Sequence, residues 1–194
     1  MTLGSNFIPG DDEDHIIAAQ IVSGQKELFR LLVKRHEQAV YGMGMSFFRN
    51  AEDASDFTQE VFLKTYRNLS RFEGRSRFST WLYKIAYNTA INSINRKKDY
   101  QSLAEEEIAG DFDTPERKLL KSIARDAVWD AIKELPDRFR ICVDLFFFYD
   151  RSYHEIEAIT GYPVNTIKSH VFRAKKILRE KLAQYAGLAE GGAE

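Results

Sequence analysis

The most constraining stretch of this chain is residues 152–182, where two helical patterns meet at Gly161-Tyr162-Pro163. Pro163 lacks a backbone N–H and restrains the residue before it, so one continuous helix through this point is unfavourable. Asn165 and Thr166 are residue types that cap helix N-termini, and they follow the break. The sequence therefore predicts a helix over 153–160, a tight turn, and a second helix over 165–185.

The second of these helices has two chemically different faces. One face is apolar at a spacing of three or four residues, which predicts a buried stripe of Val164, Ile167, Val171, Ala174 and Leu178. The other face carries cations for phosphates and polar side chains for base edges, as a helix in a DNA major groove requires. Its members are Thr166, Lys168, Ser169, Phe172, Arg173 and Lys176. Taken alone, the same pattern fits an ordinary two-helix corner with a solvated charged face.

The overall charge hides a strong segregation along the sequence. The 194 residues are 44% apolar and 29% charged with a net charge of −1, which is typical of a globular protein. Between residues 99 and 116 there are many acidic residues and no Lys or Arg, whereas 96–98 and 168–181 are basic. Such local patches, rather than the net charge, govern binding to nucleic acid.

Several classes of protein are disfavoured by simple patterns. Cys142 is the only cysteine, so neither an intramolecular disulfide nor a multi-cysteine zinc site can form. We interpret it as a small buried hydrophobic residue, with a redox-sensing thiol as the alternative. The acidic N-terminus does not resemble a signal peptide, and no apolar run approaches the length of a membrane span. We therefore expect a cytoplasmic protein.

Helical periodicity predicts an all-α protein built from two small helical modules joined by an acidic, flexible linker. No segment alternates with period two over the length of a strand. The first module covers 12–100, with helices over 13–22, 26–48, 51–69 and 79–95. The linker covers 101–115 and contains Gly110. The second module covers 116–185, with helices over 116–135, 137–149, 153–160 and 165–185, and residues 186–194 form a tail.

The fourth helix of the first module carries a second nucleic-acid signature. Its predicted buried face consists of Phe78, Trp81, Leu82, Ile85, Ile91 and Ile94. A polar stripe of Lys84, Asn88, Asn92 and Asn95 runs beside Tyr83 and Tyr87, just after a loop that contains Arg75 and Arg77. Cations, amides and rings on one surface suit single-stranded DNA and flipped bases. The alternative is that Trp81 and both tyrosines are core or boundary residues.

The third helix presents an acidic face that includes one apolar residue. Helical spacing places Phe57, Val61, Tyr66 and Leu69 inward and leaves Asp56, Gln59, Glu60 and Leu63 exposed. Such a row is either a solvated face or a protein-docking surface. Asp53, Asp56 and Glu60 could in principle hold Mg²⁺, which would suggest a nuclease. No nucleophile stands near a plausible base, so we assign no catalytic residue, metal ligand, cofactor or small-molecule substrate.

Three of these blocks occur together and in order. The segments DFTQEVF at 56–62 and FSTWLYKIA at 78–86 precede the helix-turn-helix at fitting separations. Together they resemble an extracytoplasmic-function (ECF) sigma factor of the sigma-70 family, over about residues 13–182. The resemblance implies a promoter-specificity subunit of bacterial RNA polymerase that is not itself an enzyme.

The resemblance also implies a role for each surface. Asp56, Gln59, Glu60 and Leu63 match the segment that docks on the β′ clamp coiled coil of core RNA polymerase, and the β flap is a further contact. The residues that match the −10 recognition and melting segment are Arg75, Arg77, Trp81, Tyr83, Lys84 and Asn88. Lys168, Ser169, Phe172 and Arg173 match positions that face the −35 major groove. The acidic linker matches the segment directed toward the RNA exit channel, and an anti-sigma factor is an expected partner.

The sequence departs from the family pattern at two positions. Glu157 stands where many relatives have a small alanine against the second helix of the helix-turn-helix. Either its side chain is displaced outward, or the two helices cross differently. His170 replaces a frequent arginine, which predicts a weaker or pH-dependent DNA contact.

Two other functions are weighed against the sigma-factor hypothesis. A regulator that binds duplex DNA without polymerase would not need the surface between Arg71 and Asn88. A nuclease would show Mg²⁺-dependent cleavage that is lost on Asp56→Ala.

Overall fold

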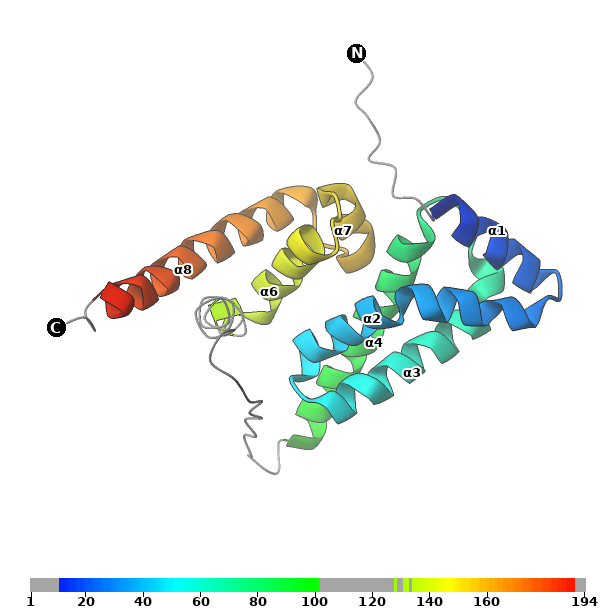
Figure 1. Cartoon of the computed structure of the whole chain (residues 1–194), viewed down its shortest axis with the longest axis horizontal. Helices are drawn as coiled ribbons and strands as arrows, with labels where there is room; N and C mark the ends of the chain where they lie inside the picture. Colours follow the sequence, from blue (N-terminus) through cyan, green and yellow to red (C-terminus); the bar gives the residue numbers. More distant parts are fainter. Residues whose placement is uncertain (1–10, 102–127, 129–130, 133, 191–194) are drawn as a thin grey trace, which may run out of the picture. The chain divides into compact units, whose positions relative to one another are not determined.

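The computed structural model describes residues 11–101, 128, 131–132 and 134–190 (Figure 1). Within these residues every regular element is helical and there is no strand, which confirms the predicted all-α class. The chain divides into two compact units, residues 1–103 and 104–194. Apart from Gln101, which ends α4, the acidic linker 101–115 lies outside the described residues, as does most of the predicted helix 116–135, so those two predictions remain untested.

The first unit is a helical bundle whose elements follow the predicted order. It contains α1 (Asp11–Val22), the 3-10 turn η1 (Lys26–Leu28), α2 (Phe29–Phe48), α3 (Ala51–Asn68), the 3-10 turn η2 (Leu69–Arg71) and α4 (Phe78–Gln101). Figure 1 shows α2, α3 and α4 side by side, and contacts between all three pairs support this arrangement. The long predicted helix over 26–48 is therefore a 3-10 turn followed by an α-helix.

Local chemistry explains how α2 gives way to α3. Arg49 adopts a left-handed conformation with φ 60° and donates its N–H to the Met45 carbonyl, which ends α2. Asn50 is the N-cap of α3 and accepts the Asp53 N–H at 2.7 Å. The connection is therefore very short, and it forces α2 and α3 to pack as neighbours.

The α2–α3 contact is close because α2 contributes a glycine to it. A Cβ atom added to Gly44 would lie 2.8 Å from Cδ1 of Phe57 and 3.1 Å from Cα of Ala54. Phe57, Val61 and Leu32 are buried in the same core. The absence of a side chain at Gly44 therefore lets α3 approach α2 and sets how α3 is seated.

A buried carboxylate ties α1 to α2. The Asp14 side chain is only 3% exposed and accepts hydrogen bonds from Arg35 Nη1 at 2.8 Å and His36 Nε2 at 2.7 Å. Burial by itself would raise the pKa of Asp14, but the bonds from His36 and Arg35 outweigh it and leave the pKa below its ordinary value. Arg35 also pairs with Glu13, and the His36 ring packs against Phe78 with centroids 5.5 Å apart.

The described part of the second unit contains α6 (Asp137–Val143), the π-helical segment η3 (Asp144–Phe148), α7 (Tyr153–Thr160) and α8 (Val164–Glu190). Leu135, Phe139, Val143 and Ala174 form its core cluster, with Ile177 and Leu178 packed against it. This cluster joins α6 to α8, while Ile156 and Ile159 bury one face of α7. Figure 1 labels these three α-helices, whose ribbons are coloured from yellow to red.

Three predicted helices differ in detail from the observed ones. The predicted helix over 137–149 widens into a π-helix after Val143, and Phe146 stacks on Tyr153 with centroids 4.8 Å apart. α4 and α8 both run past their predicted ends, to Gln101 and Glu190. Neither extension contains a proline that would stop the helix.

We expect Asp14→Asn to lower the free energy of unfolding of the first unit by about 2 kcal/mol at about pH 7. The folded pKa of Asp14 lies below the ordinary value of 3.8, so its contribution is complete above that pH. The contribution is lost as the pH falls through the folded pKa, so the difference between variant and wild type should shrink toward about pH 3.

Urea unfolding followed by Trp81 fluorescence, in a Trp129→Phe background, would measure this difference in the first unit. Glu37→Gln, which changes an exposed acid on α2, serves as the control and should shift stability by less than about 0.5 kcal/mol. An Asp14→Asn deficit of equal size at both pH values would contradict the assignment.

Candidate functional site

The side chains of Asp56, Gln59, Glu60 and Leu63, here called the α3 row, lie on the side of α3 opposite to its buried residues. Ala54, Phe57 and Val61 face the core, so Asp56 and Gln59 are exposed and Leu63 is 57% exposed. Glu60 is half-buried and pairs with Lys64 at 2.7 Å. Tyr66, which was predicted to face inward, is instead partly exposed and packs edge-on against Phe29. The row is therefore an acidic surface with an exposed leucine.

Two of the three carboxylates considered for a metal site have other partners. Asp53 accepts the side-chain amide of Asn50 at 2.8 Å, and Glu60 is engaged by Lys64. Among the described residues, no three His, Cys, Asp or Glu side chains are grouped so that they could hold a metal ion. The described helices also include none that is long and apolar enough to cross a membrane.

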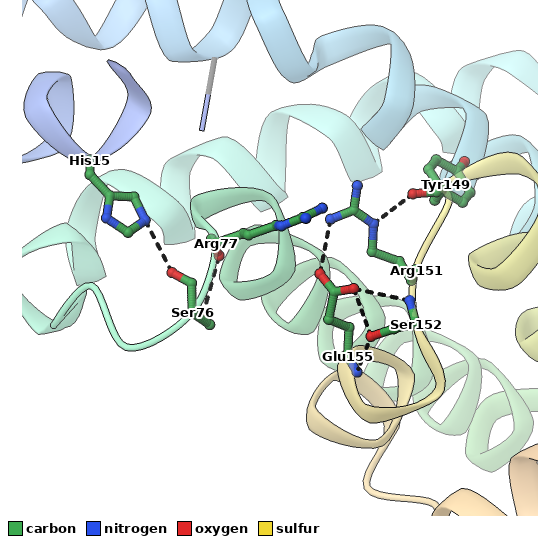
Figure 2. A network of polar contacts seen from close by, with 7 residues as sticks. All are labelled: His15, Ser76, Arg77, Tyr149, Arg151, Ser152 and Glu155. Atoms are coloured by element: carbon green, nitrogen blue, oxygen red, sulfur yellow. Dashed lines mark hydrogen bonds and ion pairs between the residues drawn. The ribbon is translucent and has the colours of Figure 1, made fainter. Parts of the chain in front are cut away.

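An aromatic cluster holds the loop that precedes α4. Phe72 packs against Trp81 at 5.2 Å and Phe78 at 5.4 Å between ring centroids, and the His15 ring meets Phe72 edge-on at 5.0 Å. Figure 2 shows the His15 Nε2 donating to the Ser76 carbonyl, a hydrogen bond of 3.1 Å. Both ends of the loop are therefore attached to the bundle.

The loop reverses at Gly74, and its two arginines have different settings. Gly74 adopts a φ of 70°, which glycine accepts without strain. Arg75 is exposed and pairs with Glu73 at 2.7 Å. Arg77 is half-buried next to the start of α4. Arg75 is thus exposed to solvent. Trp81 is half-buried and packs against Phe72 of the loop, which fits its interpretation as a boundary residue.

The polar stripe of α4 is exposed, but the aromatic rings predicted beside it are not. Lys84, Asn88, Asn92 and Asn95 all lie at the surface. Tyr83 and Tyr87 are buried, and Tyr83 is only 5% exposed, so the prediction that they flank the stripe at the surface is wrong. The buried face of α4 also includes Ala86 and Ala90, with Ile85, Ile91 and Ile94 at its edge.

The rotation of α4 relative to the prediction has a packing cause. The small side chains of Ala86 and Ala90 are fully buried, on a helix that contacts both α2 and α3, so the face that contains them belongs to the core. The isoleucines, which were predicted to form the core, are displaced to the boundary. The stripe of Lys84 and Asn88 keeps its exposure because it lies opposite this face.

The helix-turn-helix begins with a complete capping box. Ser152 Oγ accepts the Glu155 N–H, and Glu155 in turn accepts the Ser152 N–H at 3.0 Å. Figure 2 shows Arg151 beside this box, with its Nε donating to the Tyr149 carbonyl at 2.6 Å and its Nη1 to Glu155 at 3.3 Å. The start of α7 is therefore fixed by side chains on both sides.

The turn into α8 is built differently from the prediction. Gly161 adopts a φ of 77° and donates its N–H to the Glu157 carbonyl oxygen at 2.8 Å, which closes α7. α8 begins at Val164, so the predicted caps Asn165 and Thr166 lie within the helix. The acceptor for the Val164 N–H is the Glu157 carboxylate, at 3.2 Å. Its side chain is 45% exposed, in agreement with the outward displacement considered above.

α8 separates its two faces as predicted. Ile167, Val171 and Ala174 are buried. On the opposite side Lys168, Arg173 and Lys176 are exposed and Phe172 is 70% exposed, while Thr166 and Ser169 are half-buried at the margins. Lys168 lies over the Tyr153 ring, 5.8 Å from its centroid, and Lys176 is 3.9 Å from Glu180. The exposed face is a cationic surface with one prominent aromatic ring.

His170 lies on the inner side of α8 and does not belong to this exposed face. Its ring is 5.1 Å from Phe139 and 5.5 Å from Tyr162, and its Nδ1 is 3.7 Å from the Cys142 sulfur. Burial, together with the charges of Arg138 and Arg173, lowers the pKa of His170. Burial raises the pKa of the Cys142 thiol to about 12, which favours the structural interpretation of this cysteine over the redox one.

The described residues therefore present three candidate binding surfaces: the acidic row of α3, the polar stripe of α4 and the cationic face of α8. Comparisons with known proteins show the family to which this arrangement belongs. The sigma-70 region 2 family model matches residues 32–100, and the sigma-70 region 4 model matches residues 125–178. The chain is 33% identical over 182 residues to the RNA polymerase sigma-H factor of Pseudomonas aeruginosa, covering 88% of this chain and 94% of that protein.

A second relative is the ECF RNA polymerase sigma-E factor of Haemophilus influenzae, 33% identical over 87% of this chain and 95% of the relative. Among solved structures, RpoE with the anti-sigma factor NepR from Bartonella quintana matches with a TM-score of 0.66 and 23% identity, over 80% of this chain and 96% of that one. CnrH with the cytosolic domain of CnrY gives a TM-score of 0.65 at 23% identity, over 88% of this chain and 97% of that chain.

The two structures show a common fold, and the relatives show the family. The chain belongs to the ECF sigma factors of the sigma-70 family.

Proposed function

We propose that this sigma factor binds core RNA polymerase through the α3 row and reads promoter DNA through two further surfaces. The proposal is supported by the exposure of all three surfaces. Each surface is exposed because the opposite side of its helix is buried in the core. Asp56, Gln59, Glu60 and Leu63 form the α3 row, which we assign to the β′ clamp coiled coil. We assign no further residues to the β flap.

The −10 surface is assigned to the loop and the exposed stripe of α4. Arg75 and Lys84 supply cations for the phosphates, and Asn88 supplies amide groups for unstacked bases. Arg77 and Trp81 are half-buried and support the loop. Tyr83 is buried, so we assign it to packing beneath this surface instead of a direct contact with a base.

The −35 surface is assigned to the exposed face of α8. Lys168, Arg173 and Lys176 provide charge for phosphates or guanine edges, and Ser169 and Thr166 provide hydroxyl groups. Phe172 offers the apolar contact that a thymine methyl group accepts. His170 is not included, because its ring packs against Phe139 and Tyr162.

The remaining partners follow from the family. The CnrH and RpoE structures contain CnrY and NepR, and an anti-sigma factor is the corresponding partner that we propose for this chain. Since RNA polymerase works in the bacterial cytoplasm, we place the protein there. We propose no cofactor, metal ion or catalytic residue, because phosphodiester synthesis belongs to the core enzyme.

Run-off transcription with bacterial core polymerase, on fragments of the source genome, tests the proposal as a whole. The protein should produce transcripts from discrete start sites that share −35 and −10 elements. Failure to bind core polymerase would instead favour a DNA-binding regulator that acts without it.

Gln59→Ala combined with Leu63→Ala should weaken core binding about tenfold or more, because it removes the amide and the exposed apolar side chain of the α3 row. Titration of the labelled variant into core enzyme measures this loss. Asn92→Ala, an exposed change on α4, is a suitable control. Unchanged core affinity in the double variant would remove the α3 row from the interface.

Arg173→Ala should reduce transcription from the cognate promoter about fivefold to a hundredfold, since one base or phosphate contact is lost. Its affinity for core polymerase should equal that of the wild type. The nearby Arg179→Ala, which changes an exposed cation outside the proposed contact set, provides the comparison. An equal loss of core affinity in Arg173→Ala would contradict the −35 assignment.

A further inference from the structure

Glu157 makes two hydrogen bonds that together bracket the turn of the helix-turn-helix. Its backbone carbonyl accepts the Gly161 N–H at 2.8 Å, and its carboxylate accepts the Val164 N–H at 3.2 Å. One residue of α7 thus closes its own helix and caps the next one. Pro163, which precedes α8, has no side-chain oxygen to act as a cap, although its carbonyl accepts the Ile167 N–H at 3.0 Å.

Without the Glu157 carboxylate, the Val164 N–H could donate a hydrogen bond to a DNA phosphate. The first N–H groups of a helix lack partners within the helix and carry the positive end of its dipole. Helix N-termini therefore bind phosphates, and such contacts position DNA-binding proteins on the duplex without reading its sequence. In this chain the Val164 N–H at the start of α8, the recognition helix, already donates to the carboxylate of Glu157.

We propose that Glu157 is a positioning and specificity-determining residue that acts as an internal substitute for a DNA phosphate at the start of α8. It holds the recognition helix at a defined start and angle, and its hydrogen bond to the Val164 N–H blocks the position at which a backbone phosphate would otherwise bind. Binding to DNA then depends more on the base-reading side chains of α8 and less on a contact that any sequence supplies. This inference rests on the proposed −35 role of α8.

The surroundings of Glu157 agree with this role. The second carboxylate oxygen faces the exposed His154, with His154 Nδ1 3.8 Å away. The buried side of α7 is supplied by Ile156 and Ile159. Glu157 is therefore not required to fill the core. Its substitution should leave the fold of the second unit intact, which thermal unfolding followed by circular dichroism would verify.

The test compares Glu157→Ala with Glu157→Gln in reconstituted holoenzyme. Glutamine keeps an oxygen acceptor for the Val164 N–H and removes only the charge, whereas alanine removes both. Glu134→Gln changes one exposed acid of the same unit at a distance from the turn, and it controls for net charge. Each holoenzyme is titrated onto the cognate promoter and onto the same fragment with a scrambled −35 element, over a range of salt concentrations.

We expect the Glu157→Ala holoenzyme to bind the scrambled fragment more tightly than the wild type does. Its ratio of cognate to scrambled affinity should fall about fivefold. The slope of log affinity against log salt should steepen by about 0.9, as for one additional phosphate contact. Glu157→Gln should retain most of the ratio. An alanine variant with unchanged ratio and slope, or a glutamine variant identical to alanine, would overturn the inference.

The controls separate this inference from the proposed function. If the wild-type holoenzyme does not distinguish the cognate from the scrambled −35 element, the −35 assignment itself fails. If the wild type discriminates and Arg173→Ala loses that discrimination, the −35 assignment holds, and the Glu157 variants alone decide the role of the cap.

Discussion

The burial of Ile167, Val171 and Ala174 determines which side chains of α8 are exposed. A helix has one set of positions per face, so when these three side chains enter the core, Lys168, Phe172 and Arg173 must point away from it. Moving the stripe by one residue would rotate the cations toward Phe139 and Val143. The surface that we propose for DNA reading is therefore a consequence of core packing, and no separate interaction is needed to present it.

The same constraint creates the α3 row in the first unit. Ala54, Phe57 and Val61 pack into the core, and Gly44 allows α2 to approach them closely. The exposed Leu63 gives this row an apolar side chain for the docking role that we propose. In both units, therefore, the packed face of a helix fixes the orientation of the exposed face on its other side.

Sequence periodicity was a good guide wherever one face was clearly apolar and the other clearly polar. It predicted α3, α7 and α8, together with most of the exposed residues of the α3 and α8 surfaces. It failed on α4, where apolar and aromatic residues occur all round the helix and several faces could have been buried. In the structure Ala86 and Ala90 are buried together with Tyr83 and Tyr87, a face that the pattern alone did not single out.

The sequence by itself determined the number and order of the described helices, the break at Gly161 and the segregation of cations to one side of α8. These depend on local properties: the missing N–H of proline, the freedom of glycine and the helical repeat. Only the tertiary structure decided the rotation of α4, the inward position of His170 and the use of Glu157 as the cap of α8. These depend on which atoms from separate elements meet, and short-range patterns do not contain that information.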